Sequence, residues 1–258
     1  MGGRIKRRKG FSWKKSLYFL GDSLAKEIIW LINRKGLIVI LFFLLASCLG
    51  DPGQKGIEKV GEEITCPEGF KVVKVEKVID GDTVVLRGGE KLRYAGINTT
   101  ELHTDEGPPQ PYAKEAFLKN KELTEGKTLC FEKAVKERDR FGRLLGELYF
   151  PNGTSVSELL LKEGLAFVCY YEGGSKYFER LLPIQREALS EGKNLFSYVN
   201  KPQGQSKFIG NKKTRRFHHP QCLEGIKIKK KIIFNNLREA LWEGYCPSRE
   251  CINLIFAP

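Results

Sequence analysis

Residues Val78–Glu101 read VIDGDTVVLRGGEKLRYAGINTTE and decide the fold. β-Branched and alternating apolar residues predict a strand that ends at a DGD turn, a second strand over Thr83–Leu86, and a third strand after Gly88-Gly89. The third strand is predicted to run directly into the polar loop Asn98–Glu101. Oxygens from two adjacent strand ends converge on one place in such a meander, and calcium prefers ligands of this kind.

A DGD turn alone is common between strands, so Asp82 indicates a site only together with other charged residues. Arg93 lies inside the predicted third strand. Downstream, Arg138–Gly146 reads RDRFGRLLG, a charged turn before an apolar strand, and offers a second arginine, Arg143. A phosphodiester under attack carries negative charge that two arginines and a metal ion stabilise. The pattern therefore favours phosphoryl chemistry.

These segments make the chain resemble the thermonuclease, or staphylococcal nuclease-like, family. The matching motifs occur in the family's order across about half of the chain: IDGDT (Ile79–Thr83), LRYAGINTTE (Leu92–Glu101), QPYAKEA (Gln110–Ala116), DRFGR (Asp139–Arg143), LLKEGLAFVCY (Leu160–Tyr170) and NLFS (Asn194–Ser197). The resemblance implies a calcium-dependent nuclease that hydrolyses DNA and RNA with little sequence preference and leaves 3′-phosphate ends.

The resemblance also implies the metal ligands. It makes Asp82 a calcium ligand through its carboxylate and Thr99 one through its backbone carbonyl. Asn98 stands where the family usually has an aspartate ligand. An amide oxygen still coordinates calcium, but the site loses one unit of negative charge, so we expect weaker calcium binding than in a typical relative. Thr100 replaces the family's proline, which predicts a less rigid loop.

The catalytic roles implied by the same resemblance fall on Arg93, Arg143 and Glu101. The two arginines hold the scissile phosphate, and Glu101 activates or orients the attacking water. An unperturbed glutamate is ionised at neutral pH and can therefore accept a proton. Tyr170 matches a substrate-contacting tyrosine of the family, although an aromatic residue at a strand end is as often structural.

The rest of the central segment predicts the remaining elements of one domain. We expect strands over Thr128–Val135 and Leu144–Phe150, and helices over Tyr112–Leu123, Val156–Glu163 and Tyr177–Gly192. Gly164 stands where helices often stop, and Pro183 either kinks the last helix or marks its first turn. This order predicts a mainly β, α+β domain over residues 69–200. Its architecture is the OB-fold, a five-stranded barrel with packed helices.

Residues 1–48 are predicted to be a signal segment. The apolar run Leu37–Ala46 is shorter than the roughly 20 residues that a transmembrane helix needs. It leads into LASC, which resembles a bacterial lipobox in which Cys48 is lipidated. The alternatives are an uncleaved signal anchor, or an ordinary signal peptide with an incidental cysteine. A translation start at Leu31 would leave a compact signal. In each case we expect the remainder to be exported, either anchored to the envelope membrane or secreted.

Residues 49–68 are rich in glycine and glutamate and lack periodic apolar positions, so they are predicted to be a tether. Cys66 is placed to pin the end of this tether to the domain.

Charge is distributed unevenly along the chain, whose formal net charge is +13. The excess of lysine and arginine lies in residues 1–50 and 201–258, whereas residues 51–200 are slightly acidic. Net basicity therefore does not by itself predict nucleic-acid binding by the nuclease segment. An electrostatic tether to phosphate is expected in the C-terminal residues instead.

Residues 207–258 follow a linker and are predicted to form a small α/β module. They resemble the metal-binding domain of the bacterial DNA-repair protein Ada. His218 and Cys222 match an H-x3-C pair, and Cys251 matches the last ligand. Ser248 stands in place of another cysteine, while Cys246 lies two residues earlier.

Two kinds of cross-link compete in this module. A zinc site would satisfy tetrahedral coordination with four side chains, which are His218, Cys222, Cys246 and Cys251. Exported cysteines oxidise, however, so a disulfide of Cys222 with Cys246 or Cys251 is the competing prediction, and a module with neither is the third. Six cysteines besides Cys48 permit fifteen pairings. Cys130 and Cys169 lie in predicted strands and are expected to be buried thiols.

The sequence therefore predicts an exported, membrane-anchored, calcium-dependent nuclease for DNA, RNA or both, with no obligate protein partner evident. The alternative is a catalytically weak nucleic-acid-binding lipoprotein that keeps the nuclease fold. The combination of Asp82, Glu101 and two arginines favours the enzyme, because a barrel that only binds needs neither a metal ligand nor a base.

Overall fold

The computed structural model describes residues 64–104, 107–171, 175–201, 207–223 and 227–256. The predicted signal segment, with Cys48, and most of the predicted tether lie outside these residues. Among the helices of the described residues, none has the length and apolar character needed to span a membrane.

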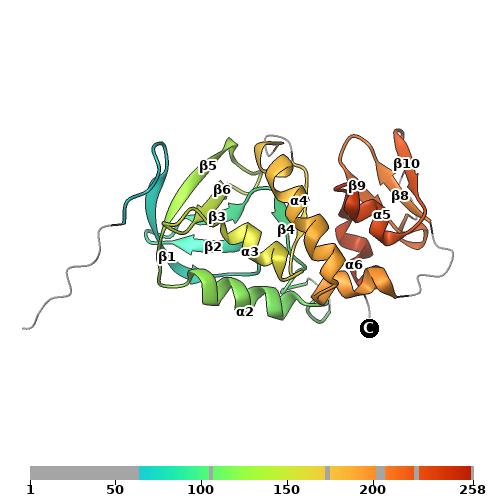
Figure 1. The fold of residues 1–258 in the computed structure, drawn as a ribbon, viewed down its shortest axis with the longest axis horizontal. Helices are drawn as coiled ribbons and strands as arrows, with labels where there is room; N and C mark the ends of the chain where they lie inside the picture. Colours follow the sequence, from blue (N-terminus) through green and yellow to red (C-terminus); the bar gives the residue numbers. More distant parts are fainter. Residues whose placement is uncertain (1–63, 105–106, 172–174, 202–206, 224–226, 257–258) are drawn as a thin grey trace, which may run out of the picture. The chain divides into compact units, whose positions relative to one another are not determined.

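Five strands close into a barrel in the spatial order β1-β2-β3-β6-β5 (Figure 1). They are β1 (Lys71–Val78), β2 (Thr83–Leu86), β3 (Lys91–Tyr94), β5 (Thr128–Arg138) and β6 (Leu144–Tyr149). β1 pairs antiparallel with both β2 and β5, while β3 pairs parallel with β6. The predicted OB-fold barrel with packed helices is thereby confirmed.

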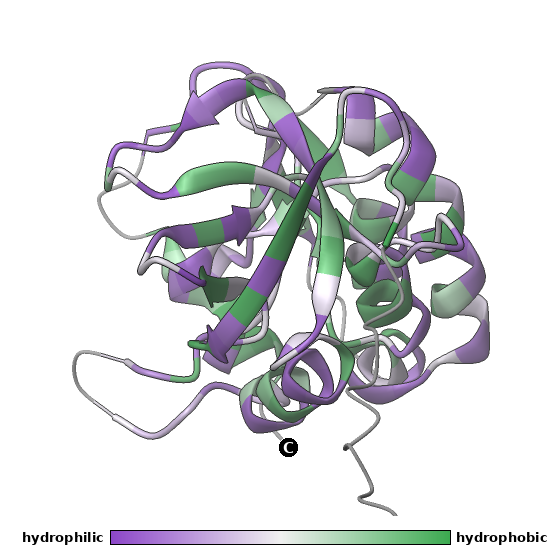
Figure 2. Ribbon diagram, turned by 90° about the vertical axis from the view of Figure 1, so that its left-hand side faces the viewer, coloured by the Kyte–Doolittle hydropathy of each residue, from purple (hydrophilic) through white to green (hydrophobic). Residues whose placement is uncertain are grey.

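The barrel closes because each strand places apolar side chains inside. Hydrophobic and hydrophilic positions alternate along the strands (Figure 2), as expected for strands with one buried face. The core residues Val75, Val84, Leu92 and Leu148 are fully buried.

The third predicted strand is interrupted in the structure. β3 ends at Tyr94, and β4 (Ile97–Asn98) pairs with β7 (Phe167–Val168) in a separate two-stranded sheet. The break occurs at Gly96, whose φ of 97° lies in the region that favours glycine. The chain thus turns before Asn98, which directs the polar loop across the end of the barrel.

Three helices cover the barrel near the predicted positions: α2 (Ala113–Thr124), α3 (Val156–Lys162) and α4 (Ser175–Glu191). The α3 N-terminus is capped by the Ser155 hydroxyl, which accepts a hydrogen bond from the Glu158 backbone N–H at 3.1 Å. Gly164, with φ 64°, follows α3 as predicted. Pro183 lies inside α4, so the prediction that it marks the first turn is wrong.

The C-terminal residues form a second, four-stranded sheet in the order β10-β8-β9-β11. Its strands are β8 (Phe208–Asn211), β9 (Arg216–His218), β10 (Lys231–Phe234) and β11 (Cys246–Pro247). Two helices complete the C-terminal module, which we define as residues 207–256; they are α5 (Leu237–Trp242) and α6 (Ile252–Phe256). Short 3-10 helices span Asn194–Asn200, Pro220–Cys222 and Arg249–Cys251.

The module shares a hydrophobic core with the nuclease segment. Leu189 of α4 and Phe196 of the 3-10 helix that follows pack in one cluster with Phe208, Leu241 and Phe256 of the module. All five side chains are fully buried. Burial of apolar area of this kind stabilises the joint between the two parts.

Three disulfides join the six described cysteines. Cys66–Cys130 pins the end of the predicted tether to β5, as the sequence suggested. Cys169–Cys246 links the residue after β7 to β11, and Cys222–Cys251 lies within the module. The prediction that Cys130 and Cys169 are buried thiols is therefore wrong, because each has a cysteine partner within bonding distance.

The four predicted zinc ligands are not assembled in this structure. Cys246 is bound to Cys169, and Cys222 is bound to Cys251, so none of these sulfurs is a thiolate. His218 remains beside them, with Nδ1 3.9 Å from the Cys251 sulfur and 3.4 Å from Glu250 Oε1. The structure corresponds to the disulfide alternative for the pair Cys222 and Cys251.

Candidate active site

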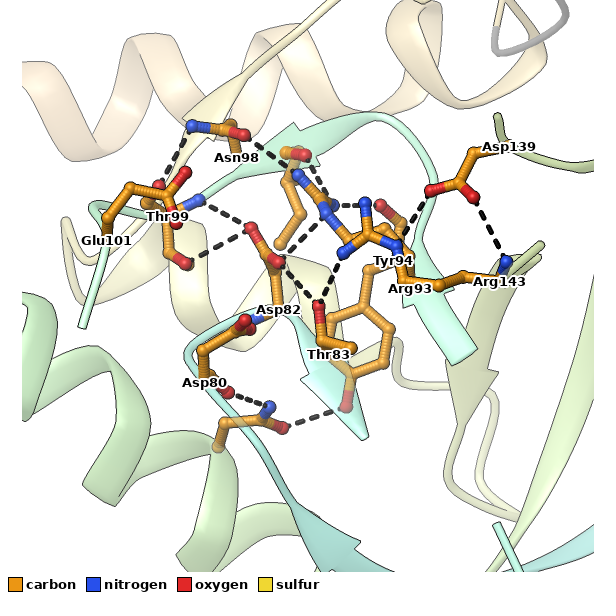
Figure 3. A network of polar contacts seen from close by, with 12 residues as sticks. Asp80, Asp82, Thr83, Arg93, Tyr94, Asn98, Thr99, Glu101, Asp139 and Arg143 are labelled. Atoms are coloured by element: carbon orange, nitrogen blue, oxygen red, sulfur yellow. Dashed lines mark hydrogen bonds and ion pairs between the residues drawn. The ribbon is translucent and has the colours of Figure 1, made fainter. Parts of the chain in front are cut away.

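The Asp82 carboxylate is the centre of a buried polar network at one end of the barrel (Figure 3). Its Oδ1 atom accepts a hydrogen bond from the Thr83 hydroxyl at 3.1 Å and lies 2.9 Å from Arg93 Nε. Its Oδ2 atom accepts hydrogen bonds from the backbone N–H and the hydroxyl of Thr99, at 2.8 and 3.1 Å. One carboxylate thus holds together the start of β2, the middle of β3 and the loop after β4.

Arg93 is buried in β3, and its guanidinium serves mainly to organise this network. Nη1 donates to the carbonyl oxygens of Tyr94 and Ile97, the latter at 2.9 Å, and Nη2 donates to Asn98 Oδ1 at 2.8 Å. With Nε on Asp82, these contacts use four of the five N–H bonds of a guanidinium. Among the described residues, one N–H of Arg93 is left for a ligand.

Asn98 is engaged at both ends of its carboxamide. Oδ1 accepts a second hydrogen bond from the Tyr171 hydroxyl at 3.1 Å, and Nδ2 donates to the Thr99 carbonyl oxygen at 2.8 Å. Two of the three groups predicted as calcium ligands, Asn98 Oδ1 and the Thr99 carbonyl, therefore already accept hydrogen bonds.

Arg143 approaches the network from the start of β6 and keeps more of its donors available. Nε contacts Asp139 Oδ2 at 2.7 Å, and Nη1 donates to the Thr83 hydroxyl at 3.4 Å. Burial raises the pKa of Asp139, but hydrogen bonds from the Arg143 side chain and backbone outweigh burial and lower that pKa. The ion pair therefore stays charged, and these contacts leave three guanidinium N–H bonds of Arg143 for an anion.

Glu101 lies beside Asp82 and is held by Gln110 from the following loop. The Glu101 backbone N–H donates to Gln110 Oε1 at 2.8 Å, and the Gln110 N–H donates to the Glu101 carbonyl at 3.0 Å. Arg249 Nε from the module lies 3.4 Å from Glu101 Oε1. Burial raises the pKa of Glu101, while the charge of Arg249 acts in the opposite direction. A carboxylate with a raised pKa is a better proton acceptor.

Asp80 was missing from the residues predicted from sequence. Its Oδ1 accepts a hydrogen bond from the Asp82 backbone N–H at 2.9 Å. Burial and the neighbouring Asp82 charge raise the pKa of Asp80 to about 7. The DGD pattern contained the signal, since both of its aspartates reach the same site.

One cavity of about 780 Å³ collects these groups. All six barrel residues predicted for catalysis or metal binding line it: Asp82, Arg93, Asn98, Thr99, Glu101 and Arg143. The cavity is also lined by residues of the C-terminal module, among them Arg216 and Arg249. The charge of the C-terminal residues predicted phosphate contact there in general, but only the packing of the module against the barrel brings these two arginines into the cavity.

The predicted substrate-contacting tyrosine lies elsewhere. The Tyr170 ring packs edge-on against Phe178 of α4, with centroids 5.7 Å apart, and does not line the cavity. Its neighbour Tyr171 does, with its hydroxyl between Asn98 and Arg216 and its ring 5.9 Å from the Arg93 guanidinium. Adjacent residues of an extended segment point to opposite sides, so a shift of one position changes which tyrosine lines the cavity.

The oxygen-rich donor set fits a hard cation such as calcium. Asp80 and Asp82 supply carboxylates, Asn98 a carboxamide and Thr99 a backbone carbonyl. In the part of the chain that the structure describes, no three His, Cys, Asp or Glu side chains are grouped so as to hold a metal, so a cation here would also use amide and backbone oxygens. The Thr99 carbonyl oxygen has two lone pairs, so as a ligand it would be shared between the ion and Asn98 Nδ2, which now donates to it.

The chain is similar in sequence to several known proteins. Residues 91–198 match the family described as staphylococcal nuclease homologue. Endonuclease YncB of Bacillus subtilis (strain 168) is 41% identical over 131 residues, which cover 48% of this chain and 61% of the relative. The SPbeta prophage-derived endonuclease YokF of the same strain is also 41% identical over 131 residues, or 48% of this chain and 44% of the relative.

A thermonuclease of Staphylococcus hyicus is 36% identical over 127 residues, which cover 48% of this chain and 75% of that protein. The similarity thus extends over most of the staphylococcal relative. The chain spans less than two thirds of the length of the two B. subtilis relatives.

Proposed function

Because the chain belongs to the staphylococcal nuclease family, we propose that it is an endonuclease that hydrolyses phosphodiester bonds of DNA, RNA or both. The observation that carries the proposal is the convergence of Asp82, Arg93, Glu101 and Arg143 on one cavity. A barrel that only bound nucleic acid would not need a carboxylate base beside two arginines and an acidic cluster.

In the proposed reaction, Glu101 accepts a proton from a water molecule as its oxygen attacks phosphorus. The phosphorus–O5′ bond breaks and the departing O5′ takes a proton from solvent, so the products carry a 3′-phosphate and a 5′-hydroxyl. Arg143, with three N–H bonds uncommitted among the described residues, holds the phosphoryl oxygens. Arg93 contributes its one remaining N–H and keeps Asp82 in place.

We propose calcium as the metal. When bound, it would supply positive charge that offsets the charge of the scissile phosphate. Asp82, Asn98 and the Thr99 carbonyl would hold the ion, with Asp80 beside them. Asn98 contributes no negative charge, and its amide competes with the ion for the Thr99 carbonyl oxygen. Both features support weaker calcium binding than aspartate would give at this position.

We also propose that the protein is exported and anchored through a lipid on Cys48. Three disulfides support an oxidising compartment, since they join all the cysteines that follow Cys48. In cells given radiolabelled palmitate, the wild-type chain should be labelled, and Cys48→Ala should be unlabelled and released into the medium. Equal labelling of both would reject the anchor.

We propose no zinc site in the C-terminal module. The predicted cysteine ligands are engaged in disulfides, which leaves His218 without thiolate partners among the described residues. The resemblance of the module to the Ada domain therefore contributes no cofactor here.

The experiment is hydrolysis of single-stranded DNA and of RNA by the full chain, with calcium or with a chelator. Calcium-dependent cleavage that Glu101→Gln abolishes, with 3′-phosphate termini in the products, is the expected result. The exposed Glu68→Gln is the matched control. Binding of DNA without cleavage, under calcium concentrations high enough to saturate a weak site, would instead favour the catalytically weak binding lipoprotein.

A further inference from the structure

The cavity has two walls, and only one of them belongs to the barrel. The second wall consists of module residues, including Arg216, Ser248, Arg249 and Glu250. A mononucleotide-sized group at Asp82 would not need this second wall, whereas a strand that passes through the cavity would contact it.

The module wall is fixed to the barrel by covalent and buried polar links. The disulfide Cys169–Cys246 joins it to the residue after β7. Gln185 of α4 is fully buried; its Oε1 accepts from the Val168 N–H at 2.7 Å, and its Nε2 donates to the Leu241 carbonyl at 2.6 Å. These links tie the module directly to the strand that pairs with β4, so the position of the second wall is set by the fold.

Arg216 is connected to the catalytic network by hydrogen bonds. Its Nη2 donates to the Tyr171 hydroxyl at 2.9 Å, and that hydroxyl donates to Asn98 Oδ1, which also accepts from Arg93. Its Nη1 contacts the Pro247 carbonyl at 3.2 Å. Within the described residues its contacts are with neutral groups, so its positive charge is not matched by a contacting carboxylate.

Arg249 is held at the mouth of the same cavity. Its carbonyl accepts from Gln110 Nε2 at 3.4 Å, and Gln110 also fixes Glu101. Its side chain is 59% exposed, and its Nε lies 3.4 Å from Glu101 Oε1. An exposed ion pair of this kind contributes little stability. The guanidinium can therefore exchange the carboxylate for a phosphate oxygen, which frees Glu101 for water.

We propose that the C-terminal module binds the nucleic-acid strand beside the scissile bond, with Arg216 and Arg249 contacting the neighbouring phosphates. This inference rests on the proposed nuclease activity and adds a substrate subsite to it. Glu250 lies on the same wall, 3.4 Å from His218, but its single negative charge is outnumbered by the two arginines, so these three side chains together are net positive. Sequence-independent recognition through phosphates is the expected mode.

The test compares Arg216→Gln and Arg249→Gln with the wild-type chain on two substrates. One is a dinucleotide with a single phosphodiester, and the other is a single-stranded oligonucleotide of about 16 nucleotides, a length that fills an OB-fold site. Lys207→Gln is the matched control, since this exposed module residue does not line the cavity. Steady-state kcat and KM are measured with calcium, and binding of the labelled oligonucleotide is measured by fluorescence anisotropy in chelator.

Each arginine variant should bind the oligonucleotide about fivefold more weakly, with the slope of log affinity against log salt concentration reduced by about 0.7. KM for the oligonucleotide should rise by a similar factor relative to KM for the dinucleotide, whereas the Lys207→Gln control should match the wild type on both substrates. Unchanged oligonucleotide affinity in both arginine variants would overturn the proposal, as would equal effects on both substrates. If the nuclease proposal is wrong, the wild-type chain will cleave neither substrate. The anisotropy measurement needs no cleavage, so it still tests whether the two arginines bind the oligonucleotide.

Discussion

Replacing Asn98 by aspartate should convert the site into a tighter calcium site while removing a contact from the metal-free protein. The Asn98 amide donates to the Thr99 carbonyl at 2.8 Å, and a carboxylate would place an acceptor oxygen against that carbonyl. On the other side, the contact with Arg93 Nη2 at 2.8 Å would become charge-assisted.

In the absence of metal, the effects of these two changes on the free energy of unfolding nearly cancel. Loss of one hydrogen bond at a part-buried position costs about 1 kcal/mol, and strengthening of the contact with Arg93 returns about the same. With calcium, the added unit charge lies next to a divalent ion. Coulomb attraction with an effective dielectric constant of about 20 is worth several kcal/mol before desolvation and the nearby arginine are subtracted. A net gain of about 1.4–2.8 kcal/mol, or about ten- to a hundredfold in Kd, is the expected outcome.

The assay is calorimetric titration of calcium into wild type and Asn98→Asp, together with thermal unfolding in chelator and in calcium. Asn152→Asp is the control, because Asn152 lies in an exposed turn where its Oδ1 accepts from the Thr154 N–H. Asn98→Asp should gain more stability from calcium than the wild type, since tighter binding to the folded state adds to its stability. An unchanged Kd for Asn98→Asp, or an equal change in Asn152→Asp, would refute the reasoning.

Three further predictions concern stability. Burial raises the pKa of Glu147 to about 7 from an ordinary 4.5, so the folded state keeps a proton that the unfolded state releases. Glu147 alone should therefore lower stability by about 3 kcal/mol as pH rises through this window, and Glu147→Gln should remove that share of the slope in urea unfolding at several pH values, while Asp80, whose pKa is also raised to about 7, keeps its own contribution; equal slopes would contradict the prediction. Removing the Cys66–Cys130 disulfide with two alanines opens a loop with a sequence separation of 64 residues and should cost about 4 kcal/mol, measured as a lower Tm under non-reducing conditions; an unchanged Tm would show that the bond does not constrain the chain. Gly164→Ala should cost about 2–4 kcal/mol, because a Cβ there would overlap a backbone carbonyl at positive φ, whereas Gly153→Ala has open space and should cost about 1 kcal/mol; similar losses for both would exclude the overlap as the cause.

The site residues of the barrel were predictable because they lie on a short meander. Asp82, Arg93 and Asn98 are separated by few residues, and pairing of β2 with β3 brings them together through local register alone. The position of Arg143 beside these residues depends on a longer-range contact, the parallel pairing of β3 with β6. The sequence motifs that resemble the family contain the residues that these two strand pairings bring together.

The structure differs from the sequence-based expectation where a single position decides. The sequence does not reveal that Gly96 breaks the third strand, and the structure places Tyr171, not Tyr170, in the cavity. Both depend on backbone dihedral angles that many sequences of this composition could adopt.

By itself the sequence determined the barrel, its strand boundaries to within a few residues, and the oxygen-rich cluster with its two arginines. These follow from alternation of apolar residues and from turns, which act over short stretches of chain. Only the tertiary structure decided the cysteine pairs and the second wall of the cavity. Arg216 and Arg249 reach Tyr171 and Glu101 across separations of 45 residues or more. Such contacts are fixed by the packing of the module on α4 and by Cys169–Cys246, and no local pattern encodes them.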